Sequence, residues 1–380
     1  MNKISRRHNG FIQSLLFTTA ISAIMLMALS YQTAIAQQDL PVEQTRKNIK
    51  VLQGVRESQL FLVMNFVGDS LGVHCEHCHV KTGKNPQTNE DIWQWESDVK
   101  PPKLVARDMM KMMIDLNRTK FKDGAVTCYT CHRGSLSTDR MAPLPPRDFV
   151  KEKNETSSRT LPEAQTVISK YLSVVGQKKI GSSAIVMRGT MERIIDGTSN
   201  PIEIIFKQPN KFLIKTTTPQ DVIMQGTNGA AGWGRSSRGL RVLSGDSLQR
   251  SLAWAAVFKP VRIPDNSSQA VVTGISKVGD REVYVLRTQQ NPTQFTEMFF
   301  DVESGLLLRS ITVNETVLGP LNVQWDFSDY KDVNGLKLPS VIRTSDVAAF
   351  DTIIRRFNDM RIDSNIDDSI FDVPRTTSPQ

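Results

Sequence analysis

Two copies of one five-residue pattern contain every cysteine of the chain. Cys75-Glu76-His77-Cys78-His79 and Cys128-Tyr129-Thr130-Cys131-His132 both read Cys-x-x-Cys-His. Two thiols three positions apart lie on one face of a helical turn. Each can form a thioether with one vinyl group of a porphyrin, and the following histidine can bind its iron. This spacing is typical of covalent haem c attachment. The sequence therefore predicts two covalently bound haem c groups, held by Cys75, Cys78, Cys128 and Cys131, with His79 and His132 as proximal iron ligands.

Other uses of four cysteines were weighed against haem attachment. Four thiolates, or two thiolates and two imidazoles, can hold zinc, and four cysteines can also form two structural disulfides. Neither alternative explains why a histidine directly follows the second cysteine in both copies. Haem attachment uses all six side chains and is favoured.

The first 36 residues have the pattern of a signal peptide. Lys3, Arg6 and Arg7 form a positive segment, residues 11–29 are mostly apolar, and Ala34-Ile35-Ala36 is a small-residue cleavage site. The apolar segment is long enough to span a membrane, so an uncleaved anchor is the alternative. Because haem c is attached outside the cytoplasmic membrane, we expect an exported, periplasmic protein, and membrane association stays open.

Charge argues against a nucleic-acid partner. The formal net charge is +8, and removal of Lys3, Arg6 and Arg7 leaves 44 basic against 39 acidic residues. Four haem propionates would nearly cancel this excess. The chain has no dense basic tract interleaved with aromatic residues, which nucleic-acid binding favours.

The chain divides by composition into two parts, which predicts an α+β multidomain protein. Residues 37–141 are expected to form a mainly helical dihaem cytochrome c domain. Residues 142–160 contain Pro143, Pro145 and Pro146 and read as an exposed linker. Residues 161–380 are expected to form a mostly antiparallel β domain.

A methionine-containing helix is expected before each haem motif. Ser58 can cap the first, whose apolar residues include Met64, and Gly72 can end it. The second is expected to begin after Pro101-Pro102 and to run to about Asn117. Its helical spacing predicts one buried stripe, made of Val105, Met109, Met112, Met113 and Leu116.

The second part shows the alternation of strands. Ile202, Ile204 and Phe206 occupy alternate positions, and so do Phe212 with Ile214 and Val283 with Val285. Hairpin turns are expected at Asp196-Gly197, Glu303-Ser304-Gly305 and Asn334-Gly335. Helices are expected at 163–175 and 251–258. This part contains no cysteine or histidine, so it can offer iron no thiolate or imidazole.

Methionine is the expected distal ligand of both irons. Apart from the proximal pair, residues 37–380 contain only His74 and His77. His74 is interpreted as structural or solvent-facing, and His77 as a surface residue or one that contacts a haem propionate. Thioether sulfur suits haem iron and raises its reduction potential. Met64, eleven residues before Cys75, is predicted as the distal ligand of the first haem. For the second, spacing alone leaves Met109, Met112 and Met113 open.

The repeat of helix, methionine, turn and haem motif resembles the photosynthetic reaction centre cytochrome c subunit family over residues 45–135. Asn48-Ile49-Lys50-Val51-Leu52, the Met64 helix and the first motif carry the resemblance. So does Met112-Met113-Ile114-Asp115-Leu116-Asn117, which is similar to the family's Met-x-x-x-Leu-Asn helix. The resemblance implies Met112 as the second distal ligand, with Met109 as runner-up. Family members that serve reaction centres carry four motifs, so this chain resembles a truncated, two-haem relative.

The second part is weakly similar to lipoprotein-carrier-like half-barrels, in which a curved antiparallel sheet encloses an apolar hollow. Gly226-Thr227-Asn228-Gly229 leading to Trp233, and the hairpin at 301–308, carry this similarity. It implies an apolar ligand or a protein partner for the β domain.

Electron transfer rather than enzymatic catalysis is the expected function. With both axial positions of each iron filled, the haems exchange single electrons with a redox protein or a membrane complex, photosynthetic or respiratory. One alternative is a dihaem peroxidase, which needs an open iron position and distal acid–base groups. Another is a redox-linked sensor or carrier of a hydrophobic ligand. Trp93 and Trp95, between the motifs, are interpreted as part of a packed loop rather than a docking surface.

Overall fold

The computed structural model describes residues 39–86, 90–121, 126–138, 160–176, 181–243, 248, 270–291, 294–316, 318–346 and 352–374. The predicted signal peptide, the linker before residue 160 and the predicted helix at 251–258 lie outside these residues. Residues Asp39–Gln380 form one compact unit. Within the described residues, no helix combines the length and apolar character needed to cross a membrane.

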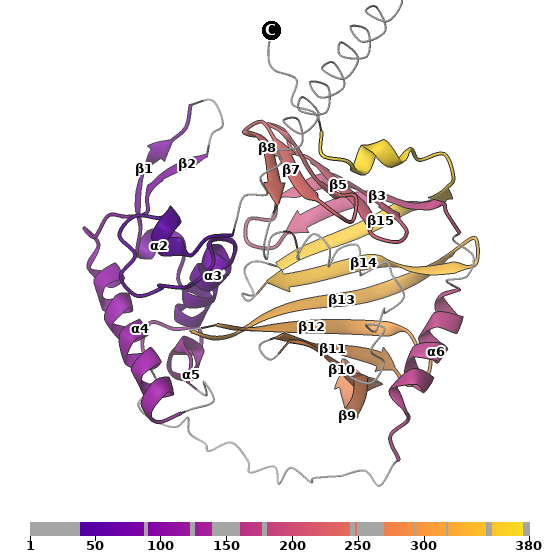
Figure 1. Cartoon of the computed structure of the whole chain (residues 1–380), viewed down its shortest axis with the longest axis horizontal. Coiled ribbons are helices and arrows are strands. Elements are labelled where there is room, and N and C mark those ends of the chain that lie inside the picture. Colours follow the sequence, from indigo (N-terminus) through magenta and orange to yellow (C-terminus); the bar gives the residue numbers. More distant parts are fainter. Residues whose placement is uncertain are drawn as a thin grey trace, which may run out of the picture. The chain divides into compact units, whose positions relative to one another are not determined.

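The first part of this unit holds several helices and one hairpin (Figure 1). In chain order they are α2 (Val42–Thr45), η2 (Glu57–Gln59), α3 (Leu60–Leu71), η3 (Cys75–His77), β1 (Val80–Lys84), β2 (Asp91–Gln94), α4 (Pro101–Thr119) and α5 (Cys128–His132). The two predicted helices are confirmed as α3 and α4. Helix α3 ends at Gly72, which adopts the left-handed conformation with φ 65°, and α4 begins with Pro101-Pro102.

The predicted buried stripe of α4 is wrong in most of its members. Met113 is buried, but the side chains of Val105, Met109 and Met112 are 59%, 43% and 49% exposed. The buried face instead contains Lys103, Met110 and Met113. Lys103 can face inward because backbone carbonyls and a carboxylate surround its ammonium group. A periodicity argument that counts only apolar residues cannot find such a face.

The hairpin β1–β2 was not expected from the sequence. Its strands pair antiparallel, with Val80 opposite Gln94 and Lys81 opposite Trp93, and the register shifts between Lys81 and Gly83. The hairpin follows the first haem motif directly and returns the chain to Trp95, beside His79.

The second part is built on a 13-stranded sheet and confirms the β-rich prediction. Every neighbouring pair is antiparallel. The strands are β3 (Ala184–Arg193), β4 (Ser199–Lys207), β5 (Lys211–Thr217), β6 (Val222–Thr227), β7 (Gly232–Ser236), β8 (Gly239–Leu243), β9 (Ala270–Val278), β10 (Arg281–Asn291), β11 (Gln294–Asp301), β12 (Leu307–Thr316), β13 (Gly319–Val333), β14 (Leu336–Asp346) and β15 (Thr352–Asp363).

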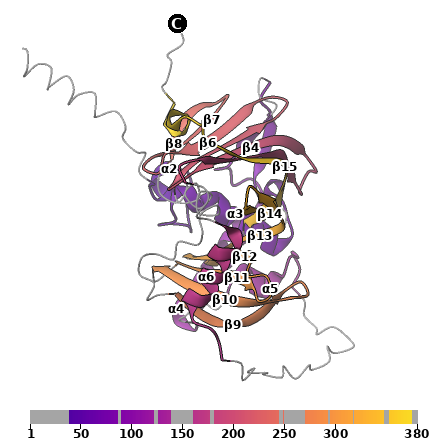
Figure 2. The same cartoon turned by 90° about the vertical axis from the view of Figure 1, so that its right-hand side faces the viewer.

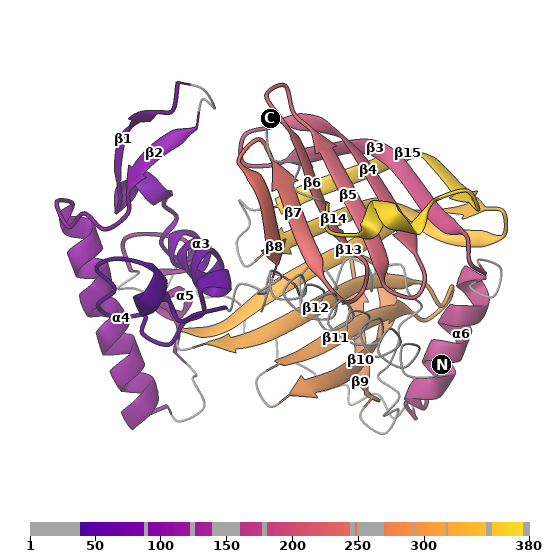
Figure 3. The same cartoon turned by 45° about the horizontal axis from the view of Figure 1, so that its top comes forward.

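Two meanders form this sheet and meet at its middle. Strands β3 to β8 follow one another outward on one side, and β9 to β15 follow one another inward on the other. The last strand, β15, pairs with the first strand, β3, so that Phe357 lies opposite Gly189. Figure 3 shows the two meanders as strands of one curved sheet.

Alternating side chains bury both faces of the central strands. On β3, Ile185 and Met187 belong to a large core that includes helix α6 (Ala164–Val175), seen in front of the strands in Figure 2. Ala184 and Val186 point the other way, into a smaller core around Trp233 and Phe371. The predicted helix at 163–175 and the three predicted hairpin turns are confirmed.

The tip of hairpin β12–β13 contributes to the core of the first part. Leu318 and Leu321 are 0% and 1% exposed and pack in one cluster with Val63, Val67 and Met113. Gly319, between them, has φ 105°, and a Cβ there would meet Thr127 at 2.5 Å. The core around the haem motifs is therefore completed by residues far along the chain.

Candidate haem-binding sites

The first motif forms a tight turn that presents its histidine. Cys75–His77 is a 3-10 helix, and the backbone N–H of His79 donates to the carbonyl of Cys75 at 2.9 Å. Cys75 and Cys78 do not form a disulfide. Burial raises the pKa of the Cys78 thiol, against the opposing charge of Lys100. The turn places both thiols and the imidazole against the same cavity.

That cavity has a volume of about 650 Å³ and a mostly apolar wall. Met64 on α3 and Met110 on α4 line it, together with Cys75, Cys78 and His79. The volume falls in the range of small-molecule and cofactor sites. One cavity thus holds two thiols, an imidazole and thioether sulfur, which is the donor set that a covalently attached haem requires.

The imidazole of His79 is held by a carbonyl. Its Nδ1 lies 3.3 Å from the carbonyl oxygen of Trp95, and since a carbonyl only accepts, Nδ1 carries the hydrogen. Nε2 is left as the nitrogen that can bind a metal. Burial lowers the pKa of His79, and the positive charge of Lys103 lowers it further. The ring is therefore neutral at pH 7, which metal binding requires.

Aromatic rings support this arrangement from the hairpin side. Trp93 and Trp95 stack with centroids 4.9 Å apart at 17°. Trp95 meets the His79 ring edge-on at 5.1 Å and Phe61 of α3 at 6.2 Å. Trp95 thus contacts the haem motif and α3 while it stays 36% exposed, and Trp93 stacks on it from strand β2.

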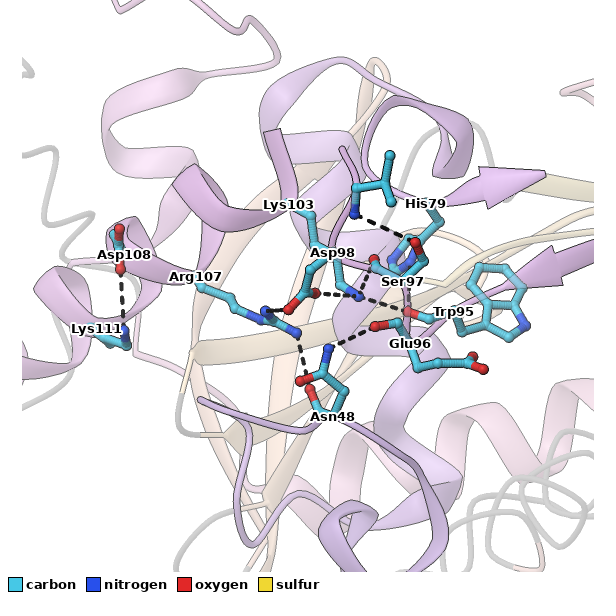
Figure 4. Close-up of polar contacts among 11 residues, drawn as sticks. Asn48, His79, Trp95, Glu96, Ser97, Asp98, Lys103, Arg107, Asp108 and Lys111 are labelled. Atoms are coloured by element: carbon cyan, nitrogen blue, oxygen red, sulfur yellow. Dashed lines mark hydrogen bonds and ion pairs between the residues drawn. The ribbon is translucent and has the colours of Figure 1, made fainter. Parts of the chain in front are cut away.

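Lys103 fixes the backbone that follows the hairpin (Figure 4). Its Nζ donates to the carbonyls of Trp95 and Ser97, each at 2.8 Å, and lies 3.1 Å from a carboxylate oxygen of Asp98. The side chain of Lys103 is only 11% exposed. The carbonyl of Trp95 consequently accepts from both Lys103 and His79.

A second cation extends this network to the start of the unit. Arg107 donates to Asp98 at 2.8 Å and to the carbonyl of Asn48 at 3.0 Å, and the amide of Asn48 donates to the carbonyl of Glu96 at 2.6 Å. The hydrogen bond from Arg107 is the main cause that holds the pKa of Asp98 well below its usual range. The network joins three separate segments around one wall of the cavity.

The second motif is a short α-helix with its own cap. In α5, Thr127 precedes Cys128, and its backbone N–H donates to the Thr130 hydroxyl at 2.9 Å as part of a capping box. Nδ1 of His132 lies 3.0 Å from the carbonyl of Ser135, which again leaves Nε2 free. Burial raises the pKa of the Cys128 thiol. The two motifs therefore orient their histidines in the same way.

Two contacts tie the second motif to the helices before it. The Asn117 amide donates to the carbonyl of Val126 at 2.7 Å and accepts from its N–H at 3.1 Å. Gly134 N–H donates to the carbonyl of Ser70 at 2.9 Å. A Cβ at Gly72 would lie 2.2 Å from the Gly134 carbonyl. The end of α3 and the end of the second motif are thus in direct contact.

The methionines differ in their surroundings. Met64 lines the cavity with the first motif, and its assignment as a distal ligand stays a prediction. Met110 lines the cavity too, although the sequence did not single it out. It lies seven residues, or two helical turns, after Lys103 and therefore on the same buried face of α4. Met109 and Met112 lie on the exposed face of α4, and the assignment of Met112 stays a prediction. His74 lies at the cavity rim and is solvent-facing, as interpreted.

A zinc site finds no support in the geometry. Across the described parts of the chain, no group of three or more His, Cys, Asp or Glu side chains gathers to hold a metal ion. The four cysteines accordingly do not form a single thiolate cluster.

Comparison with known proteins agrees with the cytochrome resemblance. Residues 18–173 match the family described as photosynthetic reaction centre cytochrome C subunit. Cytochrome c-554 of Chloroflexus aurantiacus is 30% identical over 95 residues, which are 23% of this chain and 20% of that protein. The chain thus matches only a fifth of this relative's length. The resemblance drawn from the sequence is confirmed, and a cytochrome c family match implies covalently bound haem c.

Solved structures that are similar to part of this chain have low identity. A DUF1329 family protein from Desulfovibrio piger has a TM-score of 0.40 and 12% identity, covering 55% of this chain and 96% of its own. A LolA superfamily protein from Nitrosomonas europaea has a TM-score of 0.39 and 14% identity, with coverage of 56% and 98%.

Proposed function

We propose that this chain is an exported dihaem c-type cytochrome that passes single electrons and does not act as an enzyme. The observation that carries this proposal is the cavity that Cys75, Cys78, His79 and Met64 line together. Its histidine is neutral and presents Nε2, while Nδ1–H is bonded to a backbone carbonyl. The second motif repeats the same histidine geometry.

Each group of residues has a distinct role in this proposal. Cys75, Cys78, Cys128 and Cys131 attach the two porphyrins through thioethers, and His79 and His132 are the proximal ligands. Met64 and Met112 would supply thioether sulfur to the two irons, and the apolar wall of the cavity would keep water from the first haem. A bound haem supplies reversible one-electron exchange between ferrous and ferric iron. Thioether side chains cannot transfer protons, so they do not support peroxidase chemistry.

The proposed partner is a membrane electron-transfer complex outside the cytoplasmic membrane. The match to the reaction centre cytochrome family supports this class of partner. The chain would donate electrons to such a complex, photosynthetic or respiratory, after export. The contact between α3 and the second motif at Gly72 and Gly134 holds the two haem motifs together, which a relay within one molecule requires.

Haem counting tests the proposal directly. The full chain is produced together with a cytochrome c maturation system, and covalently bound haem per chain is measured by the pyridine haemochrome assay. We expect two haems. The double variant Cys75→Ala/Cys78→Ala should keep one, and Cys128→Ala/Cys131→Ala should also keep one.

A matched control changes the motif without touching a donor. Glu76→Gln alters an exposed intervening position of the first motif and should retain both haems. A purified protein that carries zinc and no haem, or a cysteine double variant that still carries two haems, would contradict the proposal.

A further inference from the structure

A buried lysine lies against the proximal side of the first haem site. Lys103 belongs to the face of α4 that packs inward, and its side chain is 11% exposed. Its ammonium group bonds to two carbonyls and pairs with Asp98. These contacts hold a positive charge next to the proximal histidine of the first site.

One carbonyl is shared between this lysine and the proximal histidine (Figure 4). The oxygen of Trp95 accepts from Lys103 at 2.8 Å and from Nδ1 of His79 at 3.3 Å. The lysine bond is short and charge-assisted, whereas the histidine bond is longer than the usual range for N–H···O bonds. A cation on the oxygen withdraws its electron density, so the oxygen is a poorer acceptor for the imidazole.

The strength of this histidine bond controls how strongly the imidazole donates to a metal. A strong acceptor at Nδ1–H raises the basicity of the ligand, which stabilises the ferric state and lowers the reduction potential. A weak acceptor has the opposite effect. Hydrogen bonding around the ligands is one of the means by which proteins set haem potentials.

We propose that Lys103 is a positioning residue that raises the reduction potential of the haem held by Cys75 and Cys78, because it weakens the hydrogen bond from His79 to Trp95. The lysine acts through the shared carbonyl. Its net field at the site is reduced by Asp98, which lies 3.1 Å from its ammonium group. This proposal rests on the proposed haem binding.

The second motif lacks this arrangement in the described residues. His132 donates to the carbonyl of Ser135 at 3.0 Å, and no lysine or arginine of the described segments is bonded to that oxygen. The imidazole of His132 therefore has the stronger acceptor. The first haem should have the higher potential of the two, and an electron should pass from the second haem to the first.

Redox titration of the haem-loaded protein tests this. An optical titration resolves two one-electron steps, and Lys103→Met removes the charge and the donors at similar side-chain length. We expect the higher of the two midpoint potentials to fall while the lower stays unchanged. In the ferrous state, the nuclear magnetic resonance signal of the His79 Nδ1–H should move downfield as its bond to Trp95 shortens.

Lys111→Met is the matched control, since Lys111 lies on the same helix, is exposed and pairs with Asp108 at 3.2 Å (Figure 4). It should shift neither step. Lys103→Gln keeps a neutral donor and should give a smaller fall than Lys103→Met. If Lys103→Met fails to load haem, the same criteria apply to Lys103→Gln.

The outcomes separate this inference from the proposed function. Two haems per chain with both potentials unchanged in the Lys103 variants would overturn the inference and leave the proposed function intact. A fall in the lower step alone would overturn the ranking of the two haems. Absence of haem from the unmodified protein would overturn the proposed function itself.

Discussion

At the scale of single residues, Gly54 and Gly72 differ in why each position favours glycine. Backbone conformation applies to both, and close packing applies to Gly72. Gly72 and Gly54 both have positive φ, 65° and 84°. A Cβ at Gly72 would meet the Gly134 carbonyl at 2.2 Å, whereas a Cβ at Gly54 has no atom within 4 Å. Of these two glycines, Gly72 alone combines a left-handed backbone with a steric requirement.

Alanine at each position measures the difference. We expect Gly54→Ala to lower the free energy of unfolding by about 1 kcal/mol, the cost of the left-handed conformation. Gly72→Ala should cost about 3 kcal/mol or more, because the ends of α3 and the second motif must also move apart. Denaturant unfolding of the haem-loaded protein measures both. Equal costs would show that the close approach of Gly72 and Gly134 contributes nothing.

The proposed haem-binding residues could be predicted from the sequence because each motif is defined by five consecutive residues. Cys75 to His79 and Cys128 to His132 define their own geometry within one turn. The partners of the histidine rings were not predicted. The carbonyl of Trp95 belongs to a residue sixteen positions after His79, and backbone acceptors leave no signature in residue type.

At the scale of elements, helix α4 shows where periodicity fails. Its extent was predicted correctly from Pro101-Pro102 and the following apolar residues. Its buried face was not, because Lys103 and Arg107 face inward to meet carbonyls and Asp98. The exposed side chains of Val105, Met109 and Met112 form an apolar row, which is the kind of surface that a porphyrin could cover.

The choice between Met109 and Met112 can be tested on this helix. Their exposures are similar, 43% and 49%, so each leucine variant is a control for the other. Met112→Leu should remove the sulfur-to-iron charge-transfer band of one haem and lower one midpoint potential, because the thioether ligand is lost. Met109→Leu should leave both unchanged. The reverse pattern would make Met109 the distal ligand of the second haem.

The sequence predicted the β13–β14 hairpin but not the β1–β2 hairpin. At the β13–β14 turn, Asn334 and Gly335 both have positive φ. An Asn-Gly pair favours such a turn, so this hairpin could be predicted from residue type. The β1–β2 hairpin has strands of only five and four residues with mostly exposed side chains. It therefore has no apolar alternation to recognise, although it supplies Trp93 and Trp95 to the first haem site.

At the scale of the whole molecule, the antiparallel β part was predicted from the sequence, but the pairing of its two meanders was not. Neighbouring strands in sequence pair through tight turns, which local signals reveal. The pairing of β3 with β15 joins the two meanders in the middle of the sheet, and nothing in either strand specifies so distant a partner. The packing of Leu318 in the core of the first part was not predicted either, because its partners are also distant in the sequence.

Leu318 couples the stability of the two parts. Leu318→Ala should lower the free energy of unfolding by about 2–5 kcal/mol, because it leaves a cavity in a fully buried position. The loss should appear when unfolding is followed by haem absorbance. Val271→Ala, at an exposed position of the same sheet, should have little effect. If only the signal of the sheet shifts, Leu318 does not support the haem-bearing part.

The position of Leu318 in the chain also sets an order of events during biosynthesis. Cys75 and Cys128 are synthesised well before the hairpin that carries Leu318 and Leu321. Until that hairpin arrives, the core next to the thiols stays unfinished and the motifs remain reachable. The enzymes that attach porphyrin would then reach the cysteines before this core is complete. The hairpin that carries Leu318 and Leu321 would complete the core afterwards.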